Sequence, residues 1–348
     1  MQQDTVRWRS PSNIALIKYW GKHGVQLPRN TSLSFTLSEA YTETSVRFVP
    51  RERVSDEIRL SFYFEGRENA LFAKKIQVFL GSLIPYFPFL TQYYFEIHSK
   101  NSFPHSAGIA SSASSMSALA LCICQIEQRL TGDETLDEAF WQKASRIARL
   151  GSGSACRSVY ARAAIWGKTP LLRASTDEWA IPMPERDLHP VFHDFQDTIL
   201  IISADEKAVS SRAGHALMEN HRFAEVRFQQ AHDNLSALLP ALRTGDLDAF
   251  MQITEDEALS LHALMMTSDP SFLLMRPGTL AAIEKIRDFR RMQSVPLCFT
   301  LDAGPNLHLL YPKQDAEAVL AFIKSELSKY CQEGRWIRDE VGEGATPY

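Results

Sequence analysis

The chain of 348 residues contains few cysteines and no long apolar run. The five cysteines form no CxxC pair, so the spacing typical of zinc and redox sites is absent. The most apolar segment, residues 116–126, is short and interrupted by serine, whereas a transmembrane helix needs about 20 apolar residues. The first residues, MQQDTVRWRSPSN, contain no apolar signal core. We therefore expect a cytoplasmic protein with reduced thiols and no membrane partner.

The sequence also lacks an excess of charge of one sign. It has 37 Lys and Arg against 41 Asp and Glu, a formal net charge of −4. This balance argues against a broad polyanion-binding surface and predicts no nucleic-acid partner, while a local basic pocket stays compatible with it. Apolar residues make up 45% and charged residues 22%, which is typical of globular domains and excludes disorder and coiled coil. Five histidines show no metal-ligand spacing, so we expect them to be surface or packing residues: His98, His105, His215, His221 and His308.

The chain length predicts about two domains, at about 150 residues each. Strands and helices do not alternate regularly, which favours an α+β fold over a doubly wound sheet. A proline-rich stretch without periodicity around residues 182–190 separates domains that we place at 1–187 and 188–348. The expected strands are 36–49, 58–64, 92–99, 198–203, 297–301 and 308–311. The expected helices are 70–83, 113–130, 135–150, 155–164, 210–218, 223–242, 247–266, 281–292 and 315–329.

The first segment with chemical character is SNIALIKYWGK, residues 12–22. An apolar strand ends in two lysines around an aromatic pair and a glycine, so Lys18 and Lys22 can place two ammonium groups near one anionic site. The alternative is an ordinary strand whose lysines extend toward solvent.

The second segment is FPHSAGIASSASS, residues 103–115, where a loop of small residues opens into a helix. Free backbone N–H groups and the positive end of the helix dipole would face a phosphate there. Ser111 and Ser112 add hydroxyl groups, one of which can ligate Mg²⁺. No GxxxxGK[ST] motif occurs, and the alternative is a serine-capped helix with close packing.

The third segment is GSGSACRS, residues 151–158. It predicts a helix that carries Arg157 in its first turn, where a cation opposes the helix dipole unless an anion lies between them. Arginine has a planar fork suited to carboxylate or phosphate. The alternative is an interhelical turn with a surface arginine.

The fourth segment is FTLDAGPN, residues 299–306, in which Asp302 follows an apolar strand and precedes a turn. A carboxylate fixed at a strand end can orient or deprotonate a hydroxyl group, or it serves the turn through its own backbone. A weaker segment, Ser210-Ser211-Arg212, caps a helix or brings further donors to a phosphate.

Together these segments resemble the GHMP small-molecule kinase superfamily and, within it, the mevalonate diphosphate decarboxylase family. NIALIKYWGK, FPHSAGIASSAS, GSGSACRS and TLDAGPN each resemble that family's motifs, as ordered landmarks from Asn13 to Asn306. The resemblance implies a ribosomal-protein-S5-like N-terminal domain that binds ATP and a ferredoxin-like C-terminal domain, with the site between them. It also implies ATP and Mg²⁺ as cofactors, and a homodimer by analogy.

The resemblance further implies the activity and the residue roles. ATP phosphorylates the tertiary 3-hydroxyl of mevalonate 5-diphosphate, and phosphate then leaves with CO₂ to give isopentenyl diphosphate. Asp302, Lys18 and Arg157 would be catalytic, with Arg157 also holding the substrate carboxylate. The further substrate-binding residues would be Tyr19, Lys22, Ser152, Ser154, Ser211 and Arg212. The ATP-binding residues would be Gly108, Ala110, Ser111 and Ser112, with Ser112 as the Mg²⁺ ligand.

Two segments depart from the family pattern, and in one of them Tyr160-Ala161-Arg162 replaces the small residues that the family often has after the arginine motif. In the other, the family usually has Met in place of His215 and a Thr-Ser pair near His221 and Arg222. These departures leave open a relative that acts on mevalonate 5-phosphate or mevalonate, as a decarboxylase or as a 3-kinase. A non-catalytic ATP- or isoprenoid-binding regulator would be expected to lack Asp302, Lys18 or Arg157, and all three are present.

Overall fold

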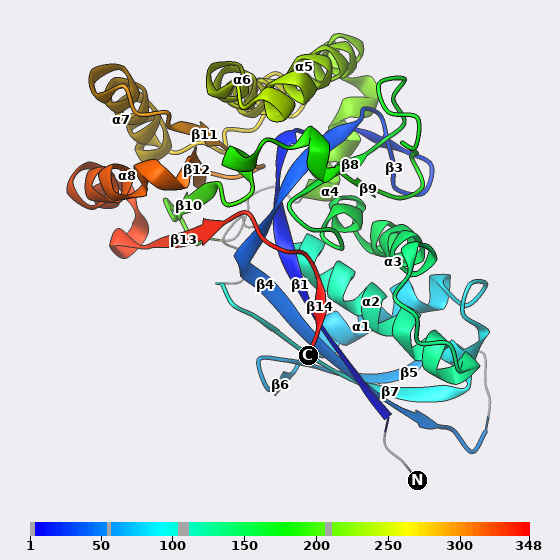
Figure 1. Ribbon diagram of the computed structural model, residues 1–348. Coiled ribbons are helices and arrows are strands. Elements are labelled where there is room, and N and C mark those ends of the chain that lie inside the picture. Colours follow the sequence, from blue (N-terminus) through cyan, green and yellow to red (C-terminus); the bar gives the residue numbers. More distant parts are fainter. Residues whose placement is uncertain (1–3, 54–56, 104–110, 206–210) are drawn as a thin grey trace.

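The protein is described by a computed structural model over residues 4–53, 57–103, 111–205 and 211–348, excluding the side chains of residues 211 and 212. It has a two-domain α+β fold with two main sheets, and helices pack on each of them (Figure 1). In the described residues the larger sheet has eight strands. They are β1 (Asp4–Ile17), β4 (Ser32–Pro50), β5 (Arg59–Phe64), β6 (Arg67–Glu68), β7 (Tyr93–Asn101), β8 (Ala163–Trp166), β9 (Ile181–Pro182) and β14 (Thr346–Pro347).

The larger sheet has the order β14-β1-β4-β7-β5-β6, with β8 beside β4 and β9 beside β8. Its long central pair, β1 and β4, is antiparallel from Asp4↔Phe48 to Ile17↔Leu33, with register shifts between Pro11 and Asn13 and between Ala15 and Ile17. In the first half of β1, buried Val6 and Trp8 alternate with exposed Arg7 and Arg9, the pattern of a strand with one solvated face.

The second half of β1 is buried on both faces, because the C-terminal part of the chain covers the side that is open to solvent earlier in the strand. Ile14 and Ile17 share an apolar cluster with Phe192, Leu235 and Phe250. The end of β1 and the beginning of β4 therefore lie at the boundary between the two halves of the protein (Figure 1). A residue that directly follows β1 therefore lies at that boundary.

Three helices pack on one face of the larger sheet (Figure 1). They are α1 (Ala70–Ser82), α2 (Ser111–Thr131) and α3 (Glu138–Gly151). The side chains of Asn69 and Asp137 cap α1 and α3 by accepting the N–H groups of Phe72 and Phe140, which satisfies donors that a helix leaves unpaired at its start. Helix α2 has small buried residues along most of its length, so it packs closely against the strands.

The smaller sheet is antiparallel, with the order β11-β12-β10-β13. The strands are β10 (Gln196–Leu200), β11 (Cys298–Thr300), β12 (Leu307–Tyr311) and β13 (Trp336–Glu340). The helices of this half are α4 (Ser211–Ala216), α5 (Ala224–Thr244), α6 (Leu247–Met266), α7 (Pro277–Gln293) and α8 (Ala316–Phe322). Gly245 ends α5 in the left-handed conformation at φ 77°, and Asp246 then caps α6 through the N–H of Ala249. This tight turn makes α5 and α6 antiparallel neighbours.

Most expected elements are present, but the helix expected at 155–164 is wrong. Residues Gly153–Arg157 form a short 3-10 helix, and Ala163–Trp166 is strand β8, fully buried beside β4. The small apolar residues suit either state, and pairing with β4 decides between them. The last expected helix, 315–329, is helical throughout most of that range but changes type: α8 ends at Phe322, a π-helix follows over Ile323–Leu327, and a 3-10 helix over Ser328–Tyr330.

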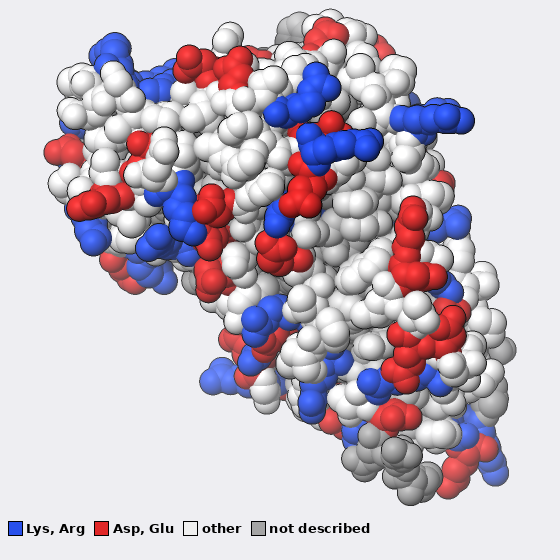
Figure 2. Space-filling view, viewed as in Figure 1, with Lys and Arg blue, Asp and Glu red and all other residues white. Residues whose placement is uncertain are grey.

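Strand β13 follows that region and was not expected from the sequence. Within the described residues, none of the helices is both apolar enough and long enough to cross a bilayer. On the face shown in Figure 2, acidic and basic side chains lie side by side, without a field of one sign.

Candidate active site

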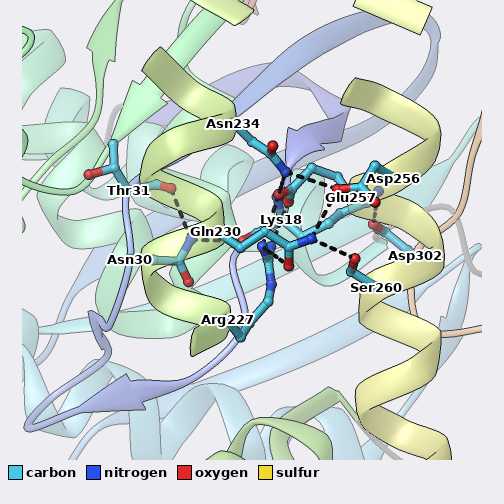
Figure 3. Close-up of polar contacts among 10 residues, drawn as sticks. All are labelled: Lys18, Asn30, Thr31, Arg227, Gln230, Asn234, Asp256, Glu257, Ser260 and Asp302. Carbon is cyan, nitrogen blue, oxygen red and sulfur yellow. Dashed lines mark hydrogen bonds and ion pairs between the residues drawn. The ribbon is translucent and has the colours of Figure 1, made fainter. Parts of the chain in front are cut away.

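Two strand ends from different sheets bring Lys18 and Asp302 together. Lys18 follows β1, and Asp302 lies two residues after β11. Lys18 Nζ lies 3.3 Å from Asp302 Oδ1, with the lysine side chain 2% and the aspartate side chain 28% exposed. Figure 3 shows the two residues among the polar side chains of helices α5 and α6. The lysine is therefore enclosed while the carboxylate is accessible to a ligand.

The electrostatics of this pair depend on both partners. Burial lowers the pKa of Lys18, and the nearby Asp302 carboxylate opposes that shift by attraction and by the hydrogen bond. A buried ammonium group is costly without a counter-ion. Asp302 thus maintains the charge on Lys18, and Lys18 fixes one oxygen of Asp302.

Arg157 is buried beside this pair and is bonded to neutral oxygens. Its Nε donates to Ser34 Oγ at 2.9 Å, and its Nη1 and Nη2 donate to Ser32 Oγ at 2.5 Å and Asn13 Oδ1 at 3.2 Å. Burial lowers the pKa of Arg157, while Asp302 is close enough to raise it. A guanidinium group has five N–H donors, so this side chain retains donors for an incoming carboxylate.

The expected placement of Arg157 in the first turn of a helix is wrong. It is the last residue of the 3-10 helix Gly153–Arg157. The C-terminal end of a helix carries the negative end of the backbone dipoles, which attracts a cation. The helix-dipole argument for an anion therefore fails. The case for an anion site at Arg157 now rests on its surroundings. Its guanidinium group is bonded to serine hydroxyls of β4, beside the end of β1 that Lys18 follows.

Tyr19 places an aromatic ring against the glycine-rich GSGS segment. A Cβ atom on Gly153 would lie 2.8 Å from the Tyr19 hydroxyl oxygen, so only glycine allows this approach. The ring of Tyr19 packs on Trp166 and His215 at centroid distances of 4.7 and 4.3 Å. Its hydroxyl is buried and has no hydrogen-bond partner among the described residues. Burial also raises the pKa of Tyr19, so a neutral O–H group is available to a ligand oxygen.

The predicted phosphate loop and the GSGS segment meet at two serines. Ser152 Oγ donates to Ser112 Oγ at 3.4 Å, and Ser112, the second residue of α2, is exposed. Ser111 begins the helix, and the carbonyl group of Ser154 accepts from Asn13 Nδ2 at 3.1 Å. The structure thus joins the segment expected to bind ATP with the segment expected to bind substrate.

Some expected site residues are only partly described or not described. Gly108 and Ala110 lie outside the described residues, and Ser211 and Arg212 begin α4 but their side chains are also outside them. Among the described residues, no cluster of three or more His, Cys, Asp and Glu forms a metal site. Mg²⁺ accepts hard oxygen ligands and is commonly held by substrate phosphates with few protein groups, so the exposed Ser112 hydroxyl fits that ion.

Lys22 is close enough to His215 for its charge to act on the imidazole. Lys22 begins the short strand β2 (Lys22–His23), which pairs with β3 (Leu27–Pro28), and its Nζ donates to Gln26 Oε1 at 3.1 Å. His215 accepts the N–H of Gly21 at Nδ1, 3.0 Å away. Burial and then the charge of Lys22 lower the pKa of His215 to about 3. The imidazole is therefore neutral near pH 7 and serves packing, as expected.

Sequence reasoning missed two buried polar residues on α6. His262 Nε2 donates to the backbone carbonyl of Asp302 at 3.1 Å, and Glu257 Oε2 accepts the backbone N–H of Lys18 at 2.8 Å (Figure 3). Both residues occupy the interior of an amphipathic helix with no motif around them. No sequence signal distinguishes them from residues that only pack.

Comparisons with known proteins identify the family of the chain. Residues 10–176 match the model of the diphosphomevalonate decarboxylase-like N-terminal domain, and residues 198–343 match the mevalonate 5-diphosphate decarboxylase C-terminal domain. A diphosphomevalonate decarboxylase of Ganoderma lucidum is 30% identical, covering 96% of this chain and 84% of that one. The mvd1 diphosphomevalonate decarboxylase of Aspergillus fumigatus is 31% identical, with 91% and 79% covered.

Solved structures resemble the chain over its whole length. The mevalonate diphosphate decarboxylase of Staphylococcus aureus has a TM-score of 0.84 at 28% identity, covering 100% of this chain and 98% of that one. A structure described as MDDEF in complex with MVAPP, AMPPCP and magnesium has a TM-score of 0.83 at 31% identity, with 99% and 98% covered. The chain therefore belongs to the diphosphomevalonate decarboxylase family, whose fold is of the GHMP kinase type.

Proposed function

We infer that the protein catalyses the ATP-dependent decarboxylation of mevalonate 5-diphosphate to isopentenyl diphosphate, ADP, phosphate and CO₂. The observation that carries this conclusion is the accessible Asp302 carboxylate 3.3 Å from the buried Lys18 ammonium group. A relative in this family has been solved with MVAPP, AMPPCP and magnesium, which supports ATP and Mg²⁺ as the cofactors of this chain.

In the first step the 3-hydroxyl oxygen of the substrate attacks the γ-phosphorus of ATP. The bond between that phosphorus and the bridging oxygen breaks, and ADP leaves with the bonding electrons. Asp302 orients the hydroxyl and accepts its proton, because its side chain is 28% exposed and therefore accessible to the substrate. Lys18 stabilises negative charge near the transferring phosphoryl group, in a reaction that depends mainly on positioning and charge neutralisation.

In the second step the C3–O bond breaks and phosphate leaves with its electron pair. The bond between C2 and the carboxylate carbon then supplies the electrons of the new double bond, and CO₂ departs. Positive charge develops at C3, which the nearby Asp302 carboxylate stabilises when its proton has passed on to solvent or phosphate. Arg157 holds the substrate carboxylate until this bond breaks, through N–H donors not used by Ser32, Ser34 and Asn13.

The remaining roles are proposals that rest on the family motifs and the arrangement above. Diphosphate and neighbouring oxygens would bind Tyr19, Lys22, Ser152, Ser154, Ser211 and Arg212. The ATP phosphates would bind at Gly108, Ala110, Ser111 and Ser112. Mg²⁺ would be held by the ATP phosphates and the Ser112 hydroxyl, where it supplies neutralisation of phosphate charge. The contact of Ser152 with Ser112 at 3.4 Å supports adjacent binding of the two substrates.

The test is product analysis with purified protein, ATP, Mg²⁺ and each of three substrates. We expect CO₂ and phosphate to appear together from mevalonate 5-diphosphate, with the highest kcat/KM among mevalonate, its 5-phosphate and its 5-diphosphate. ADP without CO₂ would identify a 3-kinase. A preference for the monophosphate or for mevalonate would replace the proposed substrate, and binding of ATP and substrate without turnover would indicate a regulator.

We also propose that residues 1–187 and 188–348 are the two domains, which the family matches at 10–176 and 198–343 support. The five described cysteines are all free and buried, which supports a cytoplasmic location. A homodimer is proposed by analogy with relatives, and sedimentation at several concentrations tests it.

A further inference from the structure

Helix α6 contacts the backbone of both members of the Lys18–Asp302 pair. It belongs to the C-terminal half of the chain, whereas Lys18 directly follows strand β1 of the N-terminal half. Neither contact involves the reacting side-chain atoms. Each one fixes the point from which a reactive side chain extends.

The first contact is made by Glu257. Its Oε2 accepts the N–H of Lys18 at 2.8 Å and also accepts from Arg227 Nη2 at 2.5 Å. Its Oε1 accepts from Arg227 Nη1 at 2.9 Å and from Asn234 Nδ2 at 2.7 Å. The carboxylate therefore has donors on both oxygens, and both members of the ion pair are at most 2% exposed. Such a saturated, enclosed carboxylate is held rigidly.

The backbone of Lys18 is held on its other side by Asn30. Asn30 Nδ2 donates to the carbonyl oxygen of Lys18 at 2.9 Å, and Asn30 is itself 8% exposed (Figure 3). Lys18 thus has both of its backbone polar groups bonded to side chains from other parts of the chain. This arrangement stops the strand end from rotating and keeps the ammonium group directed at Asp302.

The second contact is made by His262, five residues after Glu257 on α6. Its Nε2–H donates to the carbonyl oxygen of Asp302 at 3.1 Å, and the N–H of Gly304 donates to the same oxygen at 2.7 Å. His262 is 1% exposed. Burial lowers its pKa to about 4, so the ring is neutral near pH 7 and its Nε2–H points to the carbonyl group.

We propose that Glu257 and His262 are positioning residues that use α6 as a common rigid support to set the relation between Lys18 and Asp302. Because the two contacts share one helix, a displacement of either backbone changes the ammonium–carboxylate geometry. This inference rests on the proposed function for its kinetic test. It also has a structural test, which is independent of the proposed function.

The experiment compares substitutions of equal length that differ in hydrogen bonding. At position 257 we compare R227M/E257Q with R227M/E257M, which both remove the buried ion pair but only the first of which keeps an acceptor for the Lys18 N–H. At position 262 we compare H262Q, which keeps an N–H donor, with H262M, which does not. Q252M makes the same Gln-to-Met exchange at an exposed residue of α6.

We expect each Met variant to have a kcat about 10-fold to 100-fold below its Gln counterpart, because displacement of a reacting group by about 1 Å has that cost. KM for mevalonate 5-diphosphate should change by less than about threefold, since these residues do not contact substrate. Q252M should match the wild type. Kinetics are measured on protein whose folded fraction is verified by circular dichroism.

Equal kcat values in the Gln and Met variants, or a raised KM at unchanged kcat, would overturn the proposal. Crystal structures of the same variants give the second readout. The Lys18 Nζ–Asp302 Oδ1 distance should exceed about 4 Å, the limit for an ion pair, in the Met variants only. If the wild type releases no CO₂, the proposed function fails, while this distance still supports or refutes the role of α6.

Discussion

Lys18 and Asp302 are 284 positions apart in the sequence, yet their charged groups lie 3.3 Å apart in the folded protein. Of the two, only the carboxylate is accessible, at 28% exposed against 2% for the lysine side chain. A substrate hydroxyl can therefore reach Asp302 while Lys18 remains shielded from water. Water exclusion strengthens the attraction between the ammonium group and a developing negative charge.

Asp302→Asn should lower kcat by at least about a thousandfold while KM changes by less than about threefold. The substitution keeps the shape of the side chain and removes its charge and basicity. Steady-state kinetics measure the effect, with Asp288→Asn, an exposed acid on α7, as the control. An Asn variant with a near-normal kcat would show that Asp302 has no electrostatic role.

Arg157→Ala should raise KM and lower kcat together, because contact with the substrate carboxylate exists before and during the reaction. Each effect should be about 10-fold to 100-fold, as for the loss of a charged hydrogen bond. Arg157→Lys should restore little of the activity, since an ammonium group cannot make the planar contacts of a guanidinium group. An unchanged KM in the Ala variant would mean that Arg157 does not bind substrate.

Arg227→Met should lower the free energy of unfolding by about 3–5 kcal/mol, because it leaves the fully buried Glu257 carboxylate without its cation. The double variant R227M/E257Q should recover at least about 2 kcal/mol of this loss, since no buried charge remains. Urea denaturation measures both. Arg291→Met, at an exposed ion pair, should cost less than about 1 kcal/mol. A double variant no more stable than R227M would contradict the expectation.

Asp339 on β13 predicts a pH dependence of stability. Its Oδ1 accepts the N–H groups of Ser38 and Glu39, and its Oδ2 that of Ala40, each at 2.8 Å, which ties β13 to β4. Burial, followed by the charge of Asp197 on the neighbouring strand, nevertheless raises the pKa of Asp339 to about 6. The native state therefore retains this proton at pH values where the unfolded chain has lost it.

The sign follows from that difference. Between about pH 4 and pH 6 the native state binds more protons, so the contribution of Asp339 to the free energy of unfolding falls as pH rises, by on the order of 3 kcal/mol. Asp339→Asn lacks this contribution. Urea denaturation at pH 4, 5, 6 and 7 gives the free energy of unfolding of the wild type and of D339N. The stability of the wild type relative to D339N should fall from pH 4 to pH 6 and level off above pH 6. A constant difference would refute the raised pKa.

Several elements were predictable because their signals are local. The alternating apolar residues of β5, the capping Asn69 and Asp137, and the Gly245–Asp246 break all act within a few positions of the chain. The helix expected at 155–164 is wrong because its last two residues, Ala163 and Ala164, belong to strand β8, which pairs with β4, while Arg157 ends a short 3-10 helix before that strand. Short apolar segments adopt the state that their neighbours in space allow.

The same distinction applies to the site. Motif resemblance singled out Lys18, Arg157 and Asp302 as candidates, since each lies in a segment whose local composition is unlike ordinary packing. It could not identify Glu257 or His262, because an isolated polar residue on a buried helix face has no local signature of what it contacts.

Local sequence thus specified most strands and helices, and it placed Lys18 and Asp302 after the ends of strands. Tertiary packing set the distances between those residues, the burial that shifts the pKa values of Lys18 and His262, and the common support that α6 provides. The physical reason is that propensity and capping act over a few residues, whereas burial and Coulomb interactions depend on distance in space.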